Sequence, residues 1–179
     1  MGTTTALHAD DLLTLPDPPE GAHYELSQGE LITVPGAGYR HEYVKGNVYE
    51  SLVLANAKVR AGRVFCESMF RLRDDTARQP DVAFASNDRI KDVPVEDGLI
   101  PFVPDLAVEV ISKSESAEDA EIKVQEYLTA GVLEVWQVYP EARIVHIRTA
   151  SGVLQLRPAE TLETPVLPGF RVRAGEFFE

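Results

Sequence analysis

Two acidic residues interrupt an apolar segment, PDLAVEVI, at residues 104–111. The segment is otherwise typical of a buried strand, in which alternate residues share a face, so Asp105, Ala107 and Glu109 lie on one side. An unpaired carboxylate is costly to bury in such a place. Glu109 therefore requires a cation, a hydrogen-bond cluster or a metal ion, whereas Asp105 also fits a turn cap.

A second acid and a lysine extend this chemistry. Asp81 follows Pro80 at the start of DVAFAS, a short segment typical of a strand. If that strand pairs with the segment at 104–111, Asp81 and Glu109 converge, and a few carboxylates with water suit Mg²⁺ or Mn²⁺. Lys123, in the helix predicted next, brings an ammonium group that stabilises charge developing on a phosphate ester. The same residues equally fit a structural ion pair between Lys123 and Glu109.

Hydrophobic periodicity predicts the elements that position these side chains. Apolar residues at spacings of three and four predict a helix over residues 38–62, ended by Gly62, and another over about Ala117–Ala130. Alternating segments predict two strands in HYELSQGELITVP and one each in RVFCESMFRLR, QPDVAFAS, LEVWQVYP, RIVHIRTA, GVLQLRPAE and FRVRAGEFF. Together they predict a single α/β domain over residues 1–179, a mixed β-sheet flanked by helices, with residues 1–10 flexible.

Composition limits the class of protein. A chain of 179 residues, 44% hydrophobic and 26% charged, is typical of one globular domain. Its one cysteine, Cys66, excludes an internal disulfide and a cysteine-built zinc site. No apolar run approaches the ~20 residues that cross a bilayer, and the first residues lack a signal-peptide pattern, so we predict a cytoplasmic protein without a membrane partner. The net charge of −12 argues against a protein that coats nucleic acid non-specifically.

Several short motifs occur in a specific order along the chain. They are YELSQGEL, then His41, PDVAF, PDLAVEVIS, Lys123 followed by Tyr127, and AGVLEVW. This series resembles the bacterial Uma-two family, restriction-endonuclease-like proteins of the PD-(D/E)XK nuclease superfamily. The resemblance covers nearly the whole chain, from about Asp11 to the terminal LPGFRVRAGEFF.

The resemblance implies a restriction-endonuclease-like core and a set of site residues. The superfamily's first acid corresponds to Asp81 and the second to Glu109, both as catalytic metal ligands. The superfamily's lysine is expected two residues later, where this chain has Ile111. This departure is shared by the family, in which the lysine stands on the following helix, here at Lys123.

Two accessory catalytic residues and a function also follow from the resemblance. Glu30 and His41 match family positions near the site, although a strand-edge glutamate and a helix-surface histidine fit them equally. The implied activity is metal-dependent hydrolysis of DNA phosphodiester bonds, with Mg²⁺ or Mn²⁺ as cofactor and a homodimer as the assembly. The alternatives are a catalytically idle nuclease fold used for binding or assembly, which the net charge of −12 favours, and a hydrolase of smaller phosphoesters.

A stretch of basic residues bears on how so acidic a protein would meet DNA. Residues 58–78 hold the concentrated positive charge of the chain and lead directly into Asp81. We therefore predict that Arg71, Arg73 and Arg78 line the approach to the two acids. The alternative is a solvated surface around a hairpin.

Overall fold

The central element of the computed structural model, which describes residues 6–113 and 115–179, is a mixed six-stranded sheet. Its strand order is β10-β9-β8-β7-β6-β3; β7 and β8 run parallel and the other neighbours antiparallel. The strands are β3 (Gly62–Cys66), β6 (Val82–Ser86), β7 (Leu106–Val110), β8 (Glu134–Tyr139), β9 (Ile144–Thr149) and β10 (Gly152–Leu156).

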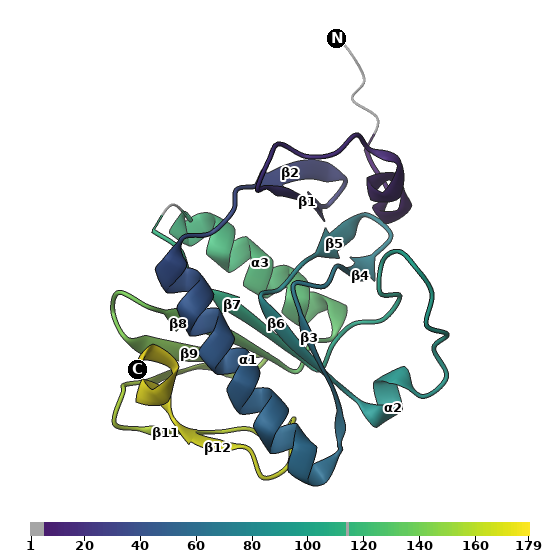
Figure 1. Cartoon of the computed structure of the whole chain (residues 1–179). Coiled ribbons are helices and arrows are strands. Elements are labelled where there is room, and N and C mark those ends of the chain that lie inside the picture. The colour runs from purple at the N-terminus through teal and green to yellow at the C-terminus, as the bar shows by residue number, and fades with distance from the viewer. Residues whose placement is uncertain (1–5, 114) are drawn as a thin grey trace.

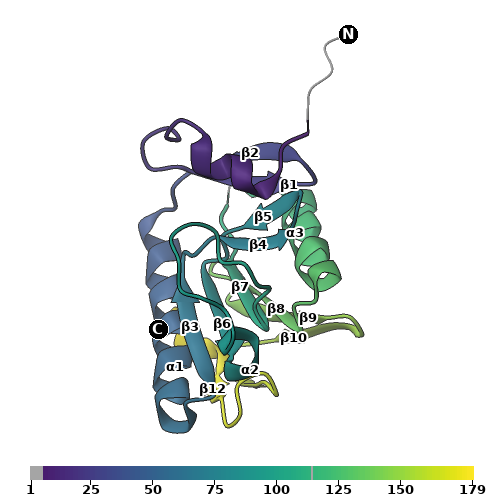
Figure 2. The ribbon, with the colours of Figure 1, turned by 90° about the vertical axis from the view of Figure 1, so that its right-hand side faces the viewer.

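Two helices cover opposite faces of this sheet, as Figure 2 shows: α1 (Tyr39–Val59) and α3 (Ala117–Ala130). Side chains alternate along β7, so Leu106 and Val108 pack in the core with α1, while Ala107 packs in the core with α3. Glu109 shares the face of Ala107 and therefore points toward α3. The predicted fold, a mixed sheet flanked by helices, is confirmed.

The limits of the two helices have local causes. The side chain of Ser116 accepts a hydrogen bond from the amide of Asp119 at the start of α3, and Gly131 ends the helix in the left-handed region with φ of 105°. Helix α1 ends earlier than predicted, because Arg60 adopts the left-handed conformation with φ of 52°. Gly62 instead opens β3, where an added Cβ would lie 2.0 Å from the carbonyl oxygen of Ala85.

A second sheet packs across one end of the first, at the top of Figures 1 and 2. Its order is β2-β1-β5-β4, and its strands are β1 (His23–Ser27), β2 (Glu30–Val34), β4 (Phe70–Arg73) and β5 (Thr76–Arg78). The prediction of one strand through RVFCESMFRLR is therefore wrong. The chain turns at Glu67, which has a positive φ of 46°, so this segment supplies β3 to one sheet and β4 to the other.

Short elements complete the fold. They are the 3₁₀ helices η1 (Ala9–Thr14) and η2 (Ala174–Phe178), the one-turn helix α2 (Asn87–Ile90), and the strand pair β11 (Thr161–Glu163) and β12 (Arg171–Arg173). Near the C-terminus, Phe170 and Phe177 pack against Trp136 in the core shared with α1. Within the described residues, no helix is long and apolar enough to cross a membrane.

The predicted flexible segment at residues 1–10 falls into two parts. Residues 1–5 lie outside the described residues. The amides of Leu7 and Ala9 donate hydrogen bonds to the carbonyl oxygens of Gly29 and Asp74, and Ala9 is fully buried. The second part of the segment is therefore held against the smaller sheet.

Candidate active site

Asp81 and Glu109 lie opposite one another at the end of two neighbouring antiparallel strands. Val82 pairs with Val108 in the β6–β7 register, so one further step places Asp81 opposite Glu109. Directly opposed residues of antiparallel strands share a face of the sheet. The Val110 amide donates a 2.7 Å hydrogen bond to Asp81 Oδ2, which holds this carboxylate against β7. The structure thus brings the two predicted acids together.

Lys123 reaches this pair from α3. Its Nζ lies 3.5 Å from Glu109 Oε2, 3.5 Å from Glu115 Oε1 and 3.8 Å from Glu25 Oε2. One helical turn further along the same face of α3, the hydroxyl of Tyr127 donates a 2.7 Å hydrogen bond to Glu109 Oε1. Both oxygens of Glu109 therefore face α3, as the alternation of β7 predicts.

The Glu109 carboxyl is poised to hold a proton when no metal ion is present. Burial, reinforced by the negative charges of Asp81 and Glu25, raises the pKa of Glu109 to about 8. Lys123 and the hydrogen bond from Tyr127 act in the opposite direction without cancelling this effect. A group in this state loses its proton readily when a cation is placed beside it.

Lys123 and Glu25 remain charged in the same cluster. Burial acts to lower the pKa of Lys123, but Glu109, Glu25 and Glu115 together raise it well above its usual range. Burial likewise acts to raise the pKa of Glu25, yet His23, Lys123 and Arg78 lower it to about 2. Lys123 is thus a fixed ammonium group and is unsuited to act as a general base.

A buried arginine links the cluster to the smaller sheet. Arg78 donates from Nη1 to Glu25 Oε2 at 2.7 Å and from Nε to Glu126 Oε2 at 2.6 Å. The Gln79 amide also donates to Glu25 Oε1 at 2.9 Å, and Ser27 Oγ donates to Glu126 Oε1 at 2.6 Å. Strands β1 and β5 are thereby fastened to α3, the helix that carries Lys123.

The prediction that three arginines line the approach to the two acids is wrong for Arg78. Its side chain is only 2% exposed and its charge is matched by Glu25 and Glu126. Arg71 pairs with Asp10, and Arg73 Nε lies 4.0 Å from Asp75 Oδ1 on the edge strand β4. These three arginines lie on β4 and β5 of the smaller sheet, and the last of them is a buried ion-pair partner.

His41 lies beside the acid pair, and Glu30 does not. His41, in the first turn of α1, places Nε2 3.2 Å from Asp81 Oδ2. Burial acts to lower the pKa of His41, but Asp81 raises it, so a proton on this ring is stabilised. Glu30 lies at the exposed start of β2, opposite Ser27. The glutamate that strand β1 contributes to the cluster is instead Glu25, which sequence reasoning missed.

Asp105, which directly precedes β7, is held by structural hydrogen bonds. Asp105 accepts hydrogen bonds from the Ser86 amide at 2.7 Å and from Arg89 Nε at 2.8 Å. Ser86 precedes the one-turn helix α2, so Asp105 stabilises the turn after β6. This is the turn-cap role that the sequence also allowed for Asp105.

A family model described as "Uma2: Putative restriction endonuclease" matches residues 9–175. The chain belongs to the Uma2 family. This confirms the predicted family and supports nuclease as the general class of function.

One solved structure similar to this Uma2 chain is described as a "putative nuclease belonging to DUF820" from Anabaena variabilis ATCC 29413. The two share 20% sequence identity with a TM-score of 0.81, over 96% of this chain and 97% of that chain. At this identity the likeness establishes a shared fold. No curated protein matches the chain in sequence.

The donor set limits which metal ion this Uma2 site would accept. Within the described residues, no group of three or more His, Cys, Asp or Glu side chains is arranged to hold an ion. A closed zinc centre, which takes four protein ligands, does not fit this arrangement. Two opposed carboxylates do fit Mg²⁺ or Mn²⁺, because Mg²⁺ keeps several waters and is bound by one or two carboxylates plus substrate phosphate.

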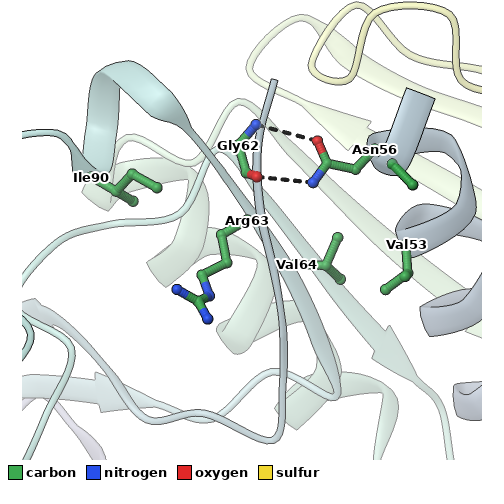
Figure 3. A pocket seen from close by; sticks show the side chains of 7 residues that line it. Val53, Asn56, Gly62, Arg63, Val64 and Ile90 are labelled. Carbon is green, nitrogen blue, oxygen red and sulfur yellow. Dashed lines mark hydrogen bonds between the residues drawn. The ribbon is translucent and has the colours of Figure 1, made fainter. Parts of the chain in front are cut away.

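A shallow hollow elsewhere on the molecule is separate from this cluster (Figure 3). It lies between α1, β3 and α2, and Asn56 on its wall donates to the carbonyl oxygen of Gly62 at 2.9 Å and accepts from its amide at 3.2 Å. Val53, which also lines it, is twelve residues along α1 from His41, about 18 Å at the rise of an α-helix. The candidate site is therefore the acid–lysine cluster.

Because the pKa of Glu109 is raised, a substitution that removes its charge is expected to raise the Tm by an amount that depends on pH. Its unfolded value near 4.5 lies below the folded value of about 8, so the stability it contributes is lost as pH rises through that range. Glu109→Gln cannot lose a proton and keeps an acceptor for Tyr127. We expect the Tm advantage of the metal-free variant over the unsubstituted protein to grow by about 10 °C between pH 5 and pH 8.5.

Differential scanning fluorimetry in EDTA across this pH range measures that gain. The matched control is Glu163→Gln, an exposed acid that pairs with Arg171 on β12. Melting curves for Glu109→Gln that stay parallel to those of the unsubstituted protein at every pH would show that Glu109 is ionised throughout.

Proposed function

We propose that this Uma2 protein is a metal-dependent endonuclease that hydrolyses phosphodiester bonds of DNA. The observation that carries the proposal is the meeting of three groups from three elements. Asp81 and Glu109 oppose one another across β6 and β7, and Lys123 Nζ lies 3.5 Å from Glu109 Oε2. Membership of a restriction-endonuclease family supplies the class of reaction.

Each residue has a distinct role in this proposal. Asp81 and Glu109 hold Mg²⁺ or Mn²⁺, and a bound divalent ion supplies neutralisation of phosphate charge and activation of water. Lys123 stays protonated and stabilises the negative charge that develops on the phosphoryl oxygens, which is the electrostatic role of a preorganised cation. His41 orients Asp81 through its 3.2 Å contact and acts as the accessory residue.

The buried network positions this machinery. Arg78 pairs with Glu25 on β1 and Glu126 on α3, and Glu25 Oε2 lies 3.8 Å from Lys123 Nζ, so the Lys123 ammonium group lies between two acids. Tyr127 fixes the other oxygen of Glu109. Residues held in this way need little reorganisation when substrate binds.

A cleavage assay tests the proposal. Supercoiled plasmid, linear duplex and single-stranded DNA are incubated with Mg²⁺, Mn²⁺ or EDTA, and products are resolved on gels. We expect cleavage with either metal and none in EDTA. Glu109→Gln should lower the rate by about 10²-fold or more, while the matched control Glu163→Gln should cleave like the unsubstituted protein.

Two measurements beside this assay separate the alternative functions: calorimetric titration with Mg²⁺, and incubation with a small phosphodiester. Binding of Mg²⁺ without cleavage of any DNA form would favour an idle nuclease fold used for binding or assembly. Cleavage of a small phosphodiester, without cleavage of DNA, would favour a hydrolase of smaller phosphoesters. A homodimeric assembly and a cytoplasmic location stay predictions, which sedimentation analysis and cell fractionation would test.

A further inference from the structure

We propose that Arg40 and Lys113 form a phosphate-binding pair at the mouth of the site, where they contact the nucleic-acid backbone. The proposal rests on the nuclease function above and names the surface that holds the polyanion. It replaces the arginine stretch at residues 71–78, whose innermost member is buried in ion pairs.

Both residues stand on the segments that carry the site. Arg40 directly precedes His41, whose ring contacts Asp81 at 3.2 Å. Lys113 lies in the loop from β7 to α3, between Glu109 and Glu115, and both of those acids contact Lys123. A backbone phosphate held by Arg40 and Lys113 would therefore lie next to the acid–lysine cluster.

The two cations converge on one point at the surface. Arg40 Nη1 lies 2.6 Å and Lys113 Nζ 3.2 Å from the same oxygen, Glu141 Oε1, in the turn between β8 and β9. Two cations that meet at one carboxylate oxygen are spaced to meet at one phosphate oxygen. Arginine and lysine are the side chains that neutralise backbone phosphates in protein–DNA complexes.

The exposure of the pair makes an exchange of partners feasible. The side chains of Arg40 and Lys113 are 65% and 77% exposed, whereas that of Arg78 is 2% exposed. Exposed ion pairs add little to stability, so exchanging Glu141 for a phosphate has a small cost. The cluster of three carries one positive charge in excess, which favours an anion in a chain that is acidic overall.

Matched controls exist elsewhere on the molecule. Lys91 follows α2 and Arg171 lies on β12, both in the lower part of Figure 1, whereas α1 begins about midway up, just below the smaller sheet. Each control cation is exposed and pairs with one acid, Lys91 with Asp88 and Arg171 with Glu163. Removing Lys91 and Arg171 changes the net charge as much as removing Arg40 and Lys113.

The test is fluorescence anisotropy with a short fluorescein-labelled DNA duplex in EDTA, at a series of NaCl concentrations. We expect the Arg40→Gln/Lys113→Gln variant to bind about tenfold more weakly at low salt. The slope of log Kobs against log salt should shrink by about 1.8, because each lost phosphate contact removes ~0.9. Glu141→Gln frees both cations and should tighten binding by about threefold.

The controls and the activity separate this inference from the proposed function. Lys91→Gln/Arg171→Gln should keep the salt slope of the unsubstituted protein. An unchanged slope in Arg40→Gln/Lys113→Gln, with the plasmid still cleaved by the unsubstituted protein, would overturn the phosphate-binding pair and leave the nuclease proposal standing. An unsubstituted protein that neither binds nor cleaves DNA would overturn both.

Discussion

Replacing Lys123 with methionine is expected to lower the rate of DNA cleavage by about 10²–10³-fold while leaving Mg²⁺ bound at least as tightly as before. The cleavage falls because the fixed ammonium group beside Glu109 is lost, 3.5 Å from its carboxylate. Metal affinity is kept or raised because a cation that repels the ion has gone. Single-turnover cleavage and isothermal titration calorimetry measure the two effects separately.

The variant will also be less stable, so the readouts must distinguish catalysis from folding. Lys123 contacts Glu25, Glu109 and Glu115, and removing it leaves these acids without that cation. Lys123→Arg keeps the charge and should restore stability more fully than cleavage, because the guanidinium is larger and planar. Lys91→Met, which removes an exposed lysine paired with Asp88, is the matched control. A folded Lys123→Met protein that cleaves DNA at the normal rate would remove Lys123 from the chemistry.

Replacing Arg78 with methionine is expected to lower the free energy of unfolding by about 3–5 kcal/mol at pH 7. The side chain of Arg78 is 2% exposed, and its removal leaves Glu25 and Glu126, 0% and 4% exposed, without their main partner. Urea unfolding followed by circular dichroism measures the loss. Arg73→Met removes an arginine from the same stretch that is 45% exposed, and it should change stability by less than about 0.5 kcal/mol.

The free energy of unfolding that Arg78→Met loses should become smaller as the pH falls. The folded pKa of Glu25 is lowered to about 2 from 4.5, so its contribution is present above pH 4.5 and is lost as pH falls toward 2. The difference between Arg78→Met and the unsubstituted protein should therefore narrow in acid. A loss no larger than that of Arg73→Met at pH 7 would show that the buried network does not support the fold.

The central pair of acids was predictable from the sequence because strand alternation is a strong constraint. Glu109 shares a face of β7 with Ala107, and Asp81 directly precedes β6, so antiparallel pairing of the two strands brings these acids together when Val82 pairs with Val108, as it does. The end of α3 at Gly131 was also predictable, because it depends on a left-handed backbone conformation that glycine adopts without strain.

The missed features depend on contacts between distant segments. Sequence spacing could not reveal that the chain turns at Glu67 and adds its next strand, β4, to the smaller sheet. For the same reason it could not tell that Arg78 would be buried, because charge alone does not distinguish a solvated arginine from an ion-paired one. Glu25 did leave a signal: like Glu109, it is an acid within an apolar alternating segment, next to Leu26, and such an acid requires a partner.

The most direct test of the metal site is anomalous scattering from Mn²⁺ in crystals of the unsubstituted protein. The crystals should be equilibrated with Mn²⁺ above pH 8, where Glu109 no longer holds its proton. We predict one strong peak at the manganese edge, about 2.0–2.2 Å from an oxygen of Asp81 and an oxygen of Glu109, and its loss in Asp81→Asn crystals. Saturating Mn²⁺ with no peak between these two carboxylates, or with a peak only at other acids, would contradict the account.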